Sequence, residues 1–145
     1  MIRYVIDASA LVKLVVPEDD SDKMQALAAL HRSGTIRLLA PDFVLTECAN
    51  VLGKYARRTE TPHQEMQEAF QILCQLGLEE VGHRALVEEA LTLAMQHDRS
   101  VYDVLYLVLA LREEVPLITA DERFVNALKP QGFSLLLLRE WTSPS

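Results

Sequence analysis

The sequence has few of the features that mark secreted or membrane proteins. Its two cysteines, Cys48 and Cys74, have no neighbours at metal-ligand spacing, so we expect two small core residues and no disulfide. No apolar run approaches the roughly 20 residues that span a membrane. The N-terminus MIRYVIDAS lacks the layout of a signal peptide. These absences predict a cytoplasmic protein without a membrane segment.

Positive charge is also scarce. The chain has 14 Lys and Arg against 21 Asp and Glu, a formal net charge of −7. This balance argues against a protein that holds nucleic acid through a broad basic surface. It does not exclude a nuclease, because carboxylates that hold a divalent cation make the metal-free chain more acidic than the working site.

Glycine and proline are few, while half of the 145 residues are hydrophobic. Such a composition predicts one compact domain with a sizeable core. No internal repeat, low-complexity tract or linker divides the chain. We expect a single domain over residues 1–140, followed by a loose polar tail over residues 141–145.

Short apolar runs alternate with helical patterns along the chain. The runs that predict strands are IRYVIDAS, TIRLLA, LGLEEVG, VPLITAD and FSLLLLR. Ser21 is expected to cap the helix before the second run, and Pro41 with Asp42 to open the helix after it. Near-continuous apolar strands separated by helices predict an α/β fold, with a twisted, mostly parallel sheet of about five strands flanked by helices.

Two of the expected strands end in an aspartate. Asp7 closes YVID, and Asp121 closes LITAD. Ligands of open α/β sheets bind at the carboxyl ends of the strands, so both side chains are expected to point into one site. Each aspartate also precedes a short helix, and helix capping alone explains it equally well.

Glu47 and Asp103 lie on expected helices beside apolar residues. Glu47 is in the middle of its helix, so capping does not explain it. The alternative is a glutamate at the core edge, whose stem packs while its carboxylate reaches water. Asp103 follows Ser100 with the S-x-x-D spacing of a helix start, so capping competes with a functional role there.

Four carboxylates in one pocket would repel one another unless a cation neutralised them. Mg²⁺ or Mn²⁺ suits such a site, because hard cations prefer carboxylate oxygen and water. The chemistry that follows is hydrolysis of a phosphodiester. Ser9 and Thr119 each lie two residues from a strand-end aspartate. Their hydroxyls are candidates for positioning a metal-bound water, although local capping is the more frequent use of such residues.

Four blocks in this order resemble a PIN-domain protein of the VapC toxin type: VIDASALVKL, LTECANVL, SVYDVLYLVLA and LITADERF. The resemblance covers nearly the whole chain. It implies a three-layer PIN-like fold over residues 1–140 and a Mg²⁺- or Mn²⁺-dependent endoribonuclease, the toxin of a type II toxin–antitoxin pair. The positions that match the family's metal-binding and catalytic acids are Asp7, Glu47, Asp103 and Asp121, and those that match its accessory hydroxyls are Ser9 and Thr119.

The resemblance also implies partners. RNA would be the substrate, a VapB-like antitoxin would cover the active site, and a second copy would complete a homodimer. Lys54, Arg57 and Arg58 follow Glu47 on one expected helix and are candidates for contacts to RNA phosphates, as is Lys13. A solvated helix end with favourable dipole placement is the competing explanation for the three on the helix.

Three other functions compete with this hypothesis. His97 and Asp98, with His63 and His83 upstream, suggest an HD-type phosphohydrolase, but the strand-end acids would then have no role. A phospho-accepting signalling domain needs paired acids after its first strand, where this chain has one. The third alternative is a catalytically silent PIN-like domain that binds RNA or a protein without turnover.

Overall fold

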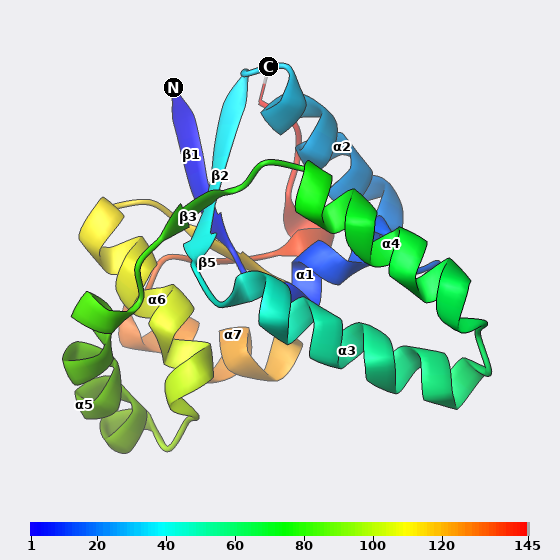
Figure 1. The fold of residues 1–145 in the computed structure, drawn as a ribbon. Coiled ribbons are helices and arrows are strands. Elements are labelled where there is room, and N and C mark those ends of the chain that lie inside the picture. Colours follow the sequence, from blue (N-terminus) through cyan, green and yellow to red (C-terminus); the bar gives the residue numbers. More distant parts are fainter. Residues whose placement is uncertain (145) are drawn as a thin grey trace.

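The computed structural model describes residues 1–144, and five parallel strands form its sheet (Figure 1). The strand order is β3-β2-β1-β4-β5, and each neighbouring pair is parallel. The strands are β1 (Ile2–Ile6), β2 (Ile36–Pro41), β3 (Glu79–Val81), β4 (Leu117–Thr119) and β5 (Leu135–Leu137). The α/β fold predicted from alternating apolar runs and helices is therefore confirmed.

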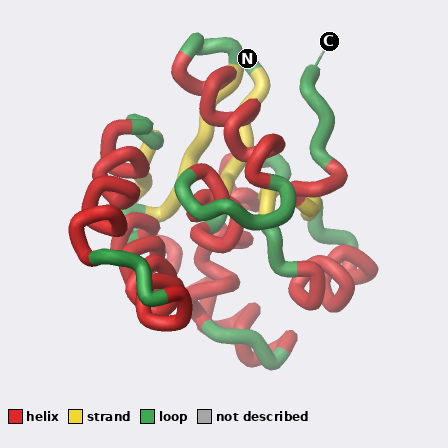
Figure 2. The backbone as a smooth tube through the Cα atoms, turned by 90° about the vertical axis from the view of Figure 1, so that its right-hand side faces the viewer, coloured by secondary structure: helices red, strands yellow, loops and turns green. Residues whose placement is uncertain are grey.

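Seven α-helices connect and cover the strands of the described chain. They are α1 (Ala8–Leu11), α2 (Ser21–Arg32), α3 (Val44–Thr59), α4 (His63–Gln75), α5 (Val87–His97), α6 (Val101–Glu113) and α7 (Glu122–Leu128). Helix α6 packs against β1, β2 and β4, whereas α2 packs against β2 and α7 against β5. Figure 2 shows the strands enclosed by helices. None of the helices in residues 1–144 is long and apolar enough to cross a membrane.

Helix α6 is the central helix of the core. Every residue from 104 to 110 is buried, as expected for a helix that is apolar on all sides. Its first turn, which carries Asp103, is exposed at the edge of the core. The helix therefore anchors this carboxylate rigidly while leaving it accessible.

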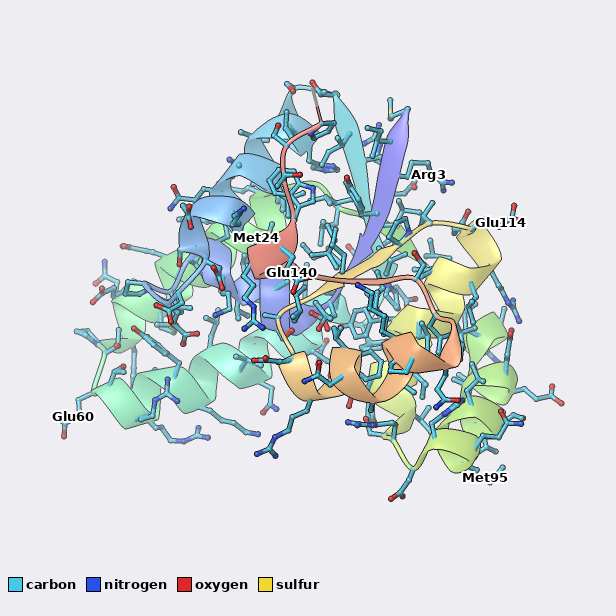
Figure 3. The ribbon with its side chains drawn as sticks, turned by 180° about the vertical axis from the view of Figure 1, so that it is seen from behind. Arg3, Met24, Glu60, Met95, Glu114 and Glu140 are labelled. Atoms are coloured by element: carbon cyan, nitrogen blue, oxygen red, sulfur yellow. The ribbon has the colours of Figure 1, made fainter. Side chains whose placement is uncertain are left out.

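Helices α3 and α4 form a hairpin that extends away from the sheet (Figure 1). Glu60, the C-cap of α3, lies at the tip of this hairpin, and Met95 of α5 lies at the opposite edge of the molecule (Figure 3). Met95 is 68% exposed, and Val87 and Leu91 at helical spacing on α5 are also exposed. The exposed apolar side chains of α5 thus form one stripe.

Two expected helix starts differ from the structure. Ser21 does not cap α2, because its hydroxyl donates to the carbonyl oxygens of Val16 and Glu18 in the preceding loop. Pro41 does not open α3, because it pairs with Val81 as the last residue of β2. Both residues make these contacts with chain segments outside the helix. Local propensity alone does not predict such contacts.

The two cysteines differ in burial. Cys48 of α3 is buried, as expected, but the expectation of a core residue is wrong for Cys74, which is exposed on α4. Leu73 is the buried residue of α4, so the face that carries Cys74 turns away from the core. Both cysteines are free thiols, in agreement with the expectation of no disulfide.

The expectation of a loose tail from residue 141 is wrong at Trp141. Its side chain is 2% exposed, and the indole N–H donates to the hydroxyl of Tyr4 at 3.3 Å. The ammonium of Lys23 donates to the Trp141 carbonyl oxygen at 2.6 Å. Burial of the large indole ring is favourable, and its N–H keeps a hydrogen-bond partner. The packed part of the chain therefore extends to this residue.

Candidate active site

The order of the strands reverses between β1 and β4. The chain moves from β1 through β2 to β3 on one side of the sheet, and β5 lies beyond β4 on the other side. Such a switch point leaves a crevice outside the carboxyl ends of the two strands. Asp7 follows the end of β1, and Asp121 follows the end of β4. The fold therefore brings together two acids that are far apart in the sequence.

Both strand-end aspartates cap a helix. Oδ1 of Asp7 accepts hydrogen bonds from the Ala10 N–H at 3.1 Å and from the Ser9 hydroxyl at 2.7 Å. Oδ1 of Asp121 accepts from the Phe124 N–H at 3.1 Å. The capping explanation is thus correct for each. It is compatible with a second role, because the cap hydrogen bonds use the same single oxygen, Oδ1, in each carboxylate.

Glu47 is held from across the pocket by Tyr106. The Tyr106 hydroxyl donates to Oε1 of Glu47 at 2.5 Å, joining α6 to α3. The Phe43 ring packs edge-on against the Tyr106 ring, with 5.4 Å between centroids. The backbone carbonyl of Phe43 accepts a hydrogen bond from the Glu47 N–H. Tyr106 was not among the predicted site residues. Its position three residues after Asp103, on the same helix face, was the signal available in the sequence.

Asp103 lies on the first turn of α6, as its spacing from Ser100 predicts. The Ser100 hydroxyl oxygen accepts from the Asp103 N–H at 3.1 Å, so Ser100 is the cap and Asp103 supplies the acid of the first turn. A carboxylate there is stabilised by the positive end of the helix dipole.

One pocket of about 510 Å³ contains all four acids. It is also lined by Ser9 and Tyr106. Thr119 lies behind this surface, fully buried, with its hydroxyl 3.2 Å from that of Ser9. The Ser9 and Thr119 hydroxyls accept from the backbone N–H groups of Ala120 and Asp121. The two predicted hydroxyl positions therefore tie the two strand ends together.

Three of the four acids have raised pKa values. Burial raises the pKa of Asp7 to about 6, against the hydrogen bonds of Thr119 and Ser9, and the charge of Asp103 raises it further. Burial also raises the pKa of Glu47, opposed by Tyr106 and reinforced by Asp103. Asp103 is accessible from the pocket, but the surrounding protein still removes part of its water, and this partial burial and the charge of Asp121 raise its pKa. The pocket holds more negative charge than its surroundings stabilise.

A divalent cation fits this donor set. Among residues 1–144 no three Asp, Glu, His or Cys side chains already meet in a geometry that would hold a metal. The carboxylates of the pocket are nevertheless the oxygen ligands that Mg²⁺ and Mn²⁺ prefer. Mg²⁺ usually keeps several waters and uses only one or two carboxylates, so an open acidic pocket is sufficient. A cation would also stabilise the charged forms of these carboxylates, which burial and, to a lesser extent, mutual repulsion disfavour.

Three of the four predicted phosphate-binding residues line the same pocket. They are Lys13, Lys54 and Arg58. Arg57 does not, because it lines a separate groove between α3 and α4. Glu18, which was not among the predicted site residues, also lines the acidic pocket and pairs with Lys13 at 3.3 Å and with Arg58 at 3.7 Å.

The groove between α3 and α4 is larger, about 1070 Å³, but lacks a comparable set of reactive groups. Its titratable residues are Arg57, Glu60 and His63. The other histidines proposed for a phosphohydrolase lie elsewhere, with His83 on Asp42 and His97 against Phe133. The described chain therefore contains no histidine-rich metal site.

The chain is similar to known proteins over most of its length. A family model described as the PIN domain matches residues 4–129. Ribonuclease VapC3 of Pyrobaculum aerophilum is 32% identical over 126 residues, covering 86% of this chain and 93% of that protein.

Solved structures show the same fold at lower identity. PAE2754 from Pyrobaculum aerophilum superposes with a TM-score of 0.69 at 18% identity, over 95% of this chain and 92% of that one. VapBC2 from Rickettsia felis, bound to a DNA fragment from its promoter, has a TM-score of 0.66 at 17% identity, over 94% and 98%. VapC20 from Mycobacterium tuberculosis, a sarcin–ricin loop cleaving toxin, has 0.63 at 20%, over 90% and 95%.

Proposed function

Because this chain belongs to the PIN domain family, we propose that it is a divalent-metal-dependent endoribonuclease, the toxin of a type II toxin–antitoxin pair. The observation that carries the proposal is the convergence of four carboxylates in one pocket at the switch point of the sheet. The similarity to a ribonuclease VapC supports nuclease activity. The acidic pocket supports the dependence on a metal.

The proposed ligands of the cation are Asp7, Glu47, Asp103 and Asp121. Bound there, Mg²⁺ or Mn²⁺ would supply an activated water and neutralise charge at the phosphodiester. Tyr106 fixes the orientation of Glu47 through its hydrogen bond. Ser9 and Thr119 hold the two strand ends at a constant separation, so the carboxylates that they carry are preorganised.

The proposed partners are an RNA substrate and a VapB-like antitoxin that covers the pocket. We place the protein in the cytoplasm, where both would meet it, and its two cysteines are free thiols. We also propose a homodimer, for which the exposed stripe of Val87, Leu91 and Met95 is the first surface to test. Light scattering of the wild type beside Leu91→Glu measures the mass, and a monomeric wild type would refute the homodimer.

The experiment that tests the enzyme is cleavage of labelled total cellular RNA by purified protein, with Mg²⁺, with Mn²⁺ and with chelator. Wild type is compared with Asp103→Asn and with Asp22→Asn, a control that removes an exposed carboxylate on α2 outside the pocket. The proposal expects metal-dependent cleavage by wild type and Asp22→Asn only. Equal cleavage by Asp103→Asn would refute the four-acid mechanism.

The same experiment tests the alternative of a silent binding domain. RNA binding by wild type and Asp103→Asn alike, with no cleavage in any metal, would favour that alternative. Neutralising a catalytic carboxylate lowers turnover much more than it lowers binding of the uncleaved strand.

A further inference from the structure

Glu18 bridges two basic residues at the mouth of the acidic pocket. Its Oε2 lies 3.3 Å from Lys13 Nζ, and its Oε1 lies 3.7 Å from Nη2 of Arg58. Lys13 belongs to a short 3₁₀ helix, Val12–Leu14, whereas Arg58 lies in the last turn of α3. One carboxylate thus neutralises two cations that come from separate elements.

The two ion pairs differ in exposure. The Lys13 side chain is only 15% exposed, so its ammonium needs an anion close by. The Arg58 side chain is 72% exposed, and an exposed pair of that kind contributes little to stability. Lys13 therefore requires a negative partner, but nothing in the pairing requires that partner to be Glu18.

The loop that carries Glu18 is held by groups other than its carboxylate. The Glu18 N–H donates to the Val16 carbonyl at 2.9 Å, and the Glu18 carbonyl accepts from the N–H and the hydroxyl of Ser21. The Ser21 hydroxyl also donates to Val16. Within residues 1–144, the hydrogen bonds and ion pairs of the carboxylate itself go to Lys13 and Arg58. The carboxylate can leave these cations without disrupting the loop.

A phosphodiester presents the same features as this carboxylate. It carries one negative charge and two free oxygens, which suit an ammonium and a guanidinium. Lys54 lines the pocket as well, and the four acids lie in the same cavity. A phosphate held between Lys13 and Arg58 would therefore place the neighbouring nucleotides over the acids.

We infer that Glu18 occupies, in the free protein, the position of an RNA phosphate, and that RNA enters the pocket by displacing the Glu18 carboxylate from Lys13 and Arg58. The inference rests on the proposed function, because it takes RNA as the ligand. Glu18 is then a built-in competitor that keeps Lys13 paired when RNA is absent and lowers the affinity for the sugar–phosphate backbone.

Two measurable effects follow for Glu18→Gln. RNA affinity in chelator rises about three- to tenfold, because the strand no longer competes with an internal anion. The slope of log K against log salt also steepens, because anions from the solution now pair with Lys13 and Arg58 and are released when RNA binds, in addition to the cations that the RNA itself releases. A purely structural role for Glu18 would not steepen this slope.

The test is fluorescence anisotropy of a short labelled single-stranded RNA in chelator, from about 50 to 200 mM salt. The matched control is Glu122→Gln, which makes the same charge change and breaks the exposed Glu122–Arg139 ion pair outside the pocket. Lys13→Gln should weaken binding, and Glu18→Gln combined with Lys13→Gln should lose most of the gain. Urea unfolding of each variant verifies that it is folded.

The outcomes separate this inference from the proposed function. Tighter binding with a steeper slope for Glu18→Gln alone supports the displacement of Glu18. Equal behaviour of Glu18→Gln and Glu122→Gln, with RNA bound by the wild type, overturns the inference and leaves the nuclease proposal standing. If the folded wild type and all variants fail to bind RNA at the lowest salt, the inference is overturned, whereas the proposed function is decided separately by the cleavage assay with Mg²⁺ or Mn²⁺.

Discussion

The acidic pocket and the groove between α3 and α4 differ in how the chain builds them. The groove between α3 and α4 is about twice the volume of the acidic pocket, yet its lining comes from one continuous stretch, residues 49–71. The acidic pocket draws on segments from Asp7 to Asp121 and gathers charges of both signs. The volume of a cavity therefore does not identify the candidate site in this molecule. The site is identified by reactive groups that come together from distant segments of the chain.

The two cavities also differ in the environment of their ionisable side chains. In the acidic pocket, burial and repulsion raise the pKa values of three carboxylates, which destabilises their charged forms. Glu60 and His63 of the groove are exposed instead, so water surrounds their side chains. Clustered carboxylates with shifted pKa values, as in the acidic pocket, are typical of functional sites.

The strongest test of this comparison removes one carboxylate from each cavity. Asp7→Asn should lower RNA cleavage by at least about a hundredfold, because it takes a proposed metal ligand from the pocket. Glu60→Gln, in the groove, should leave cleavage within about twofold of wild type. Initial rates with Mn²⁺ measure both. Comparable losses in the two variants would mean that the acidic pocket is not the site.

The next effect is on stability and its dependence on pH. The pKa of Asp7, about 6 in the folded protein, exceeds its ordinary value of 3.8, so the folded state binds more protons between these values. The free energy of unfolding should therefore fall as pH rises through this window. Asp7→Asn should flatten the fall and stabilise the metal-free protein by about 1–3 kcal/mol at pH 8.

Urea unfolding in chelator at pH 4, 6 and 8 measures this effect. The amide oxygen of asparagine still accepts the cap hydrogen bond of α1, so the variant keeps that contact. A variant that is less stable than wild type at pH 8 would show that the charge of Asp7 is already compensated in the folded protein.

A smaller effect is expected from the contact that orients Glu47. Tyr106→Phe removes the hydroxyl that donates to Oε1 and should weaken Mn²⁺ binding about three- to tenfold. Calorimetric titration of Mn²⁺ into the protein, without RNA, measures the affinity separately from turnover. Tyr102→Phe is the matched control, since Tyr102 is exposed on the same helix and does not line the pocket. Equal affinities in both variants would leave Tyr106 with a structural role only.

The smallest effect distinguishes two adjacent arginines. Arg58 lines the acidic pocket, whereas Arg57 lines the groove. Arg58→Gln should weaken binding of single-stranded RNA in chelator about two- to threefold, and Arg57→Gln less than that. Anisotropy at low salt measures both. A larger loss for Arg57→Gln would extend the RNA path onto the α3–α4 hairpin and weaken the contrast between the cavities.

The four acids and the fold class were predictable because each has a local signal. Apolar runs of strand length ended in Asp7 and Asp121. The apolar neighbours of Glu47 were a correct signal for its position, but the expectation that it lies in mid-helix was wrong, because α3 begins at Val44 and Glu47 is in its first turn. Helix α6 is apolar on all sides, which by itself predicts burial. These signals depend on neighbours within one or two turns, and such short-range preferences do not need the rest of the chain.

Contacts between distant segments were not predictable in the same way. The burial of Trp141 depends on Tyr4 and Lys23, at the other end of the chain. The pairing of Pro41 with Val81 depends on the arrival of β3. Local propensity predicted a loose tail at Trp141 and a helix start at Pro41. The free energy gained from long-range packing outweighed these local preferences.

By itself, the sequence determined the α/β class, the carboxylates at the strand ends and the acids on the helices, because alternation, spacing and capping preferences act locally. Only the tertiary structure decided that Tyr106 holds Glu47, that Glu18 pairs with Lys13 and Arg58, and that Arg57 faces a different cavity. The physical reason is that a hydrogen bond or ion pair forms only between groups that the folded chain brings within a few ångströms. Their separation along the chain, from Glu18 to Arg58 or from Glu47 to Tyr106, carries no such information.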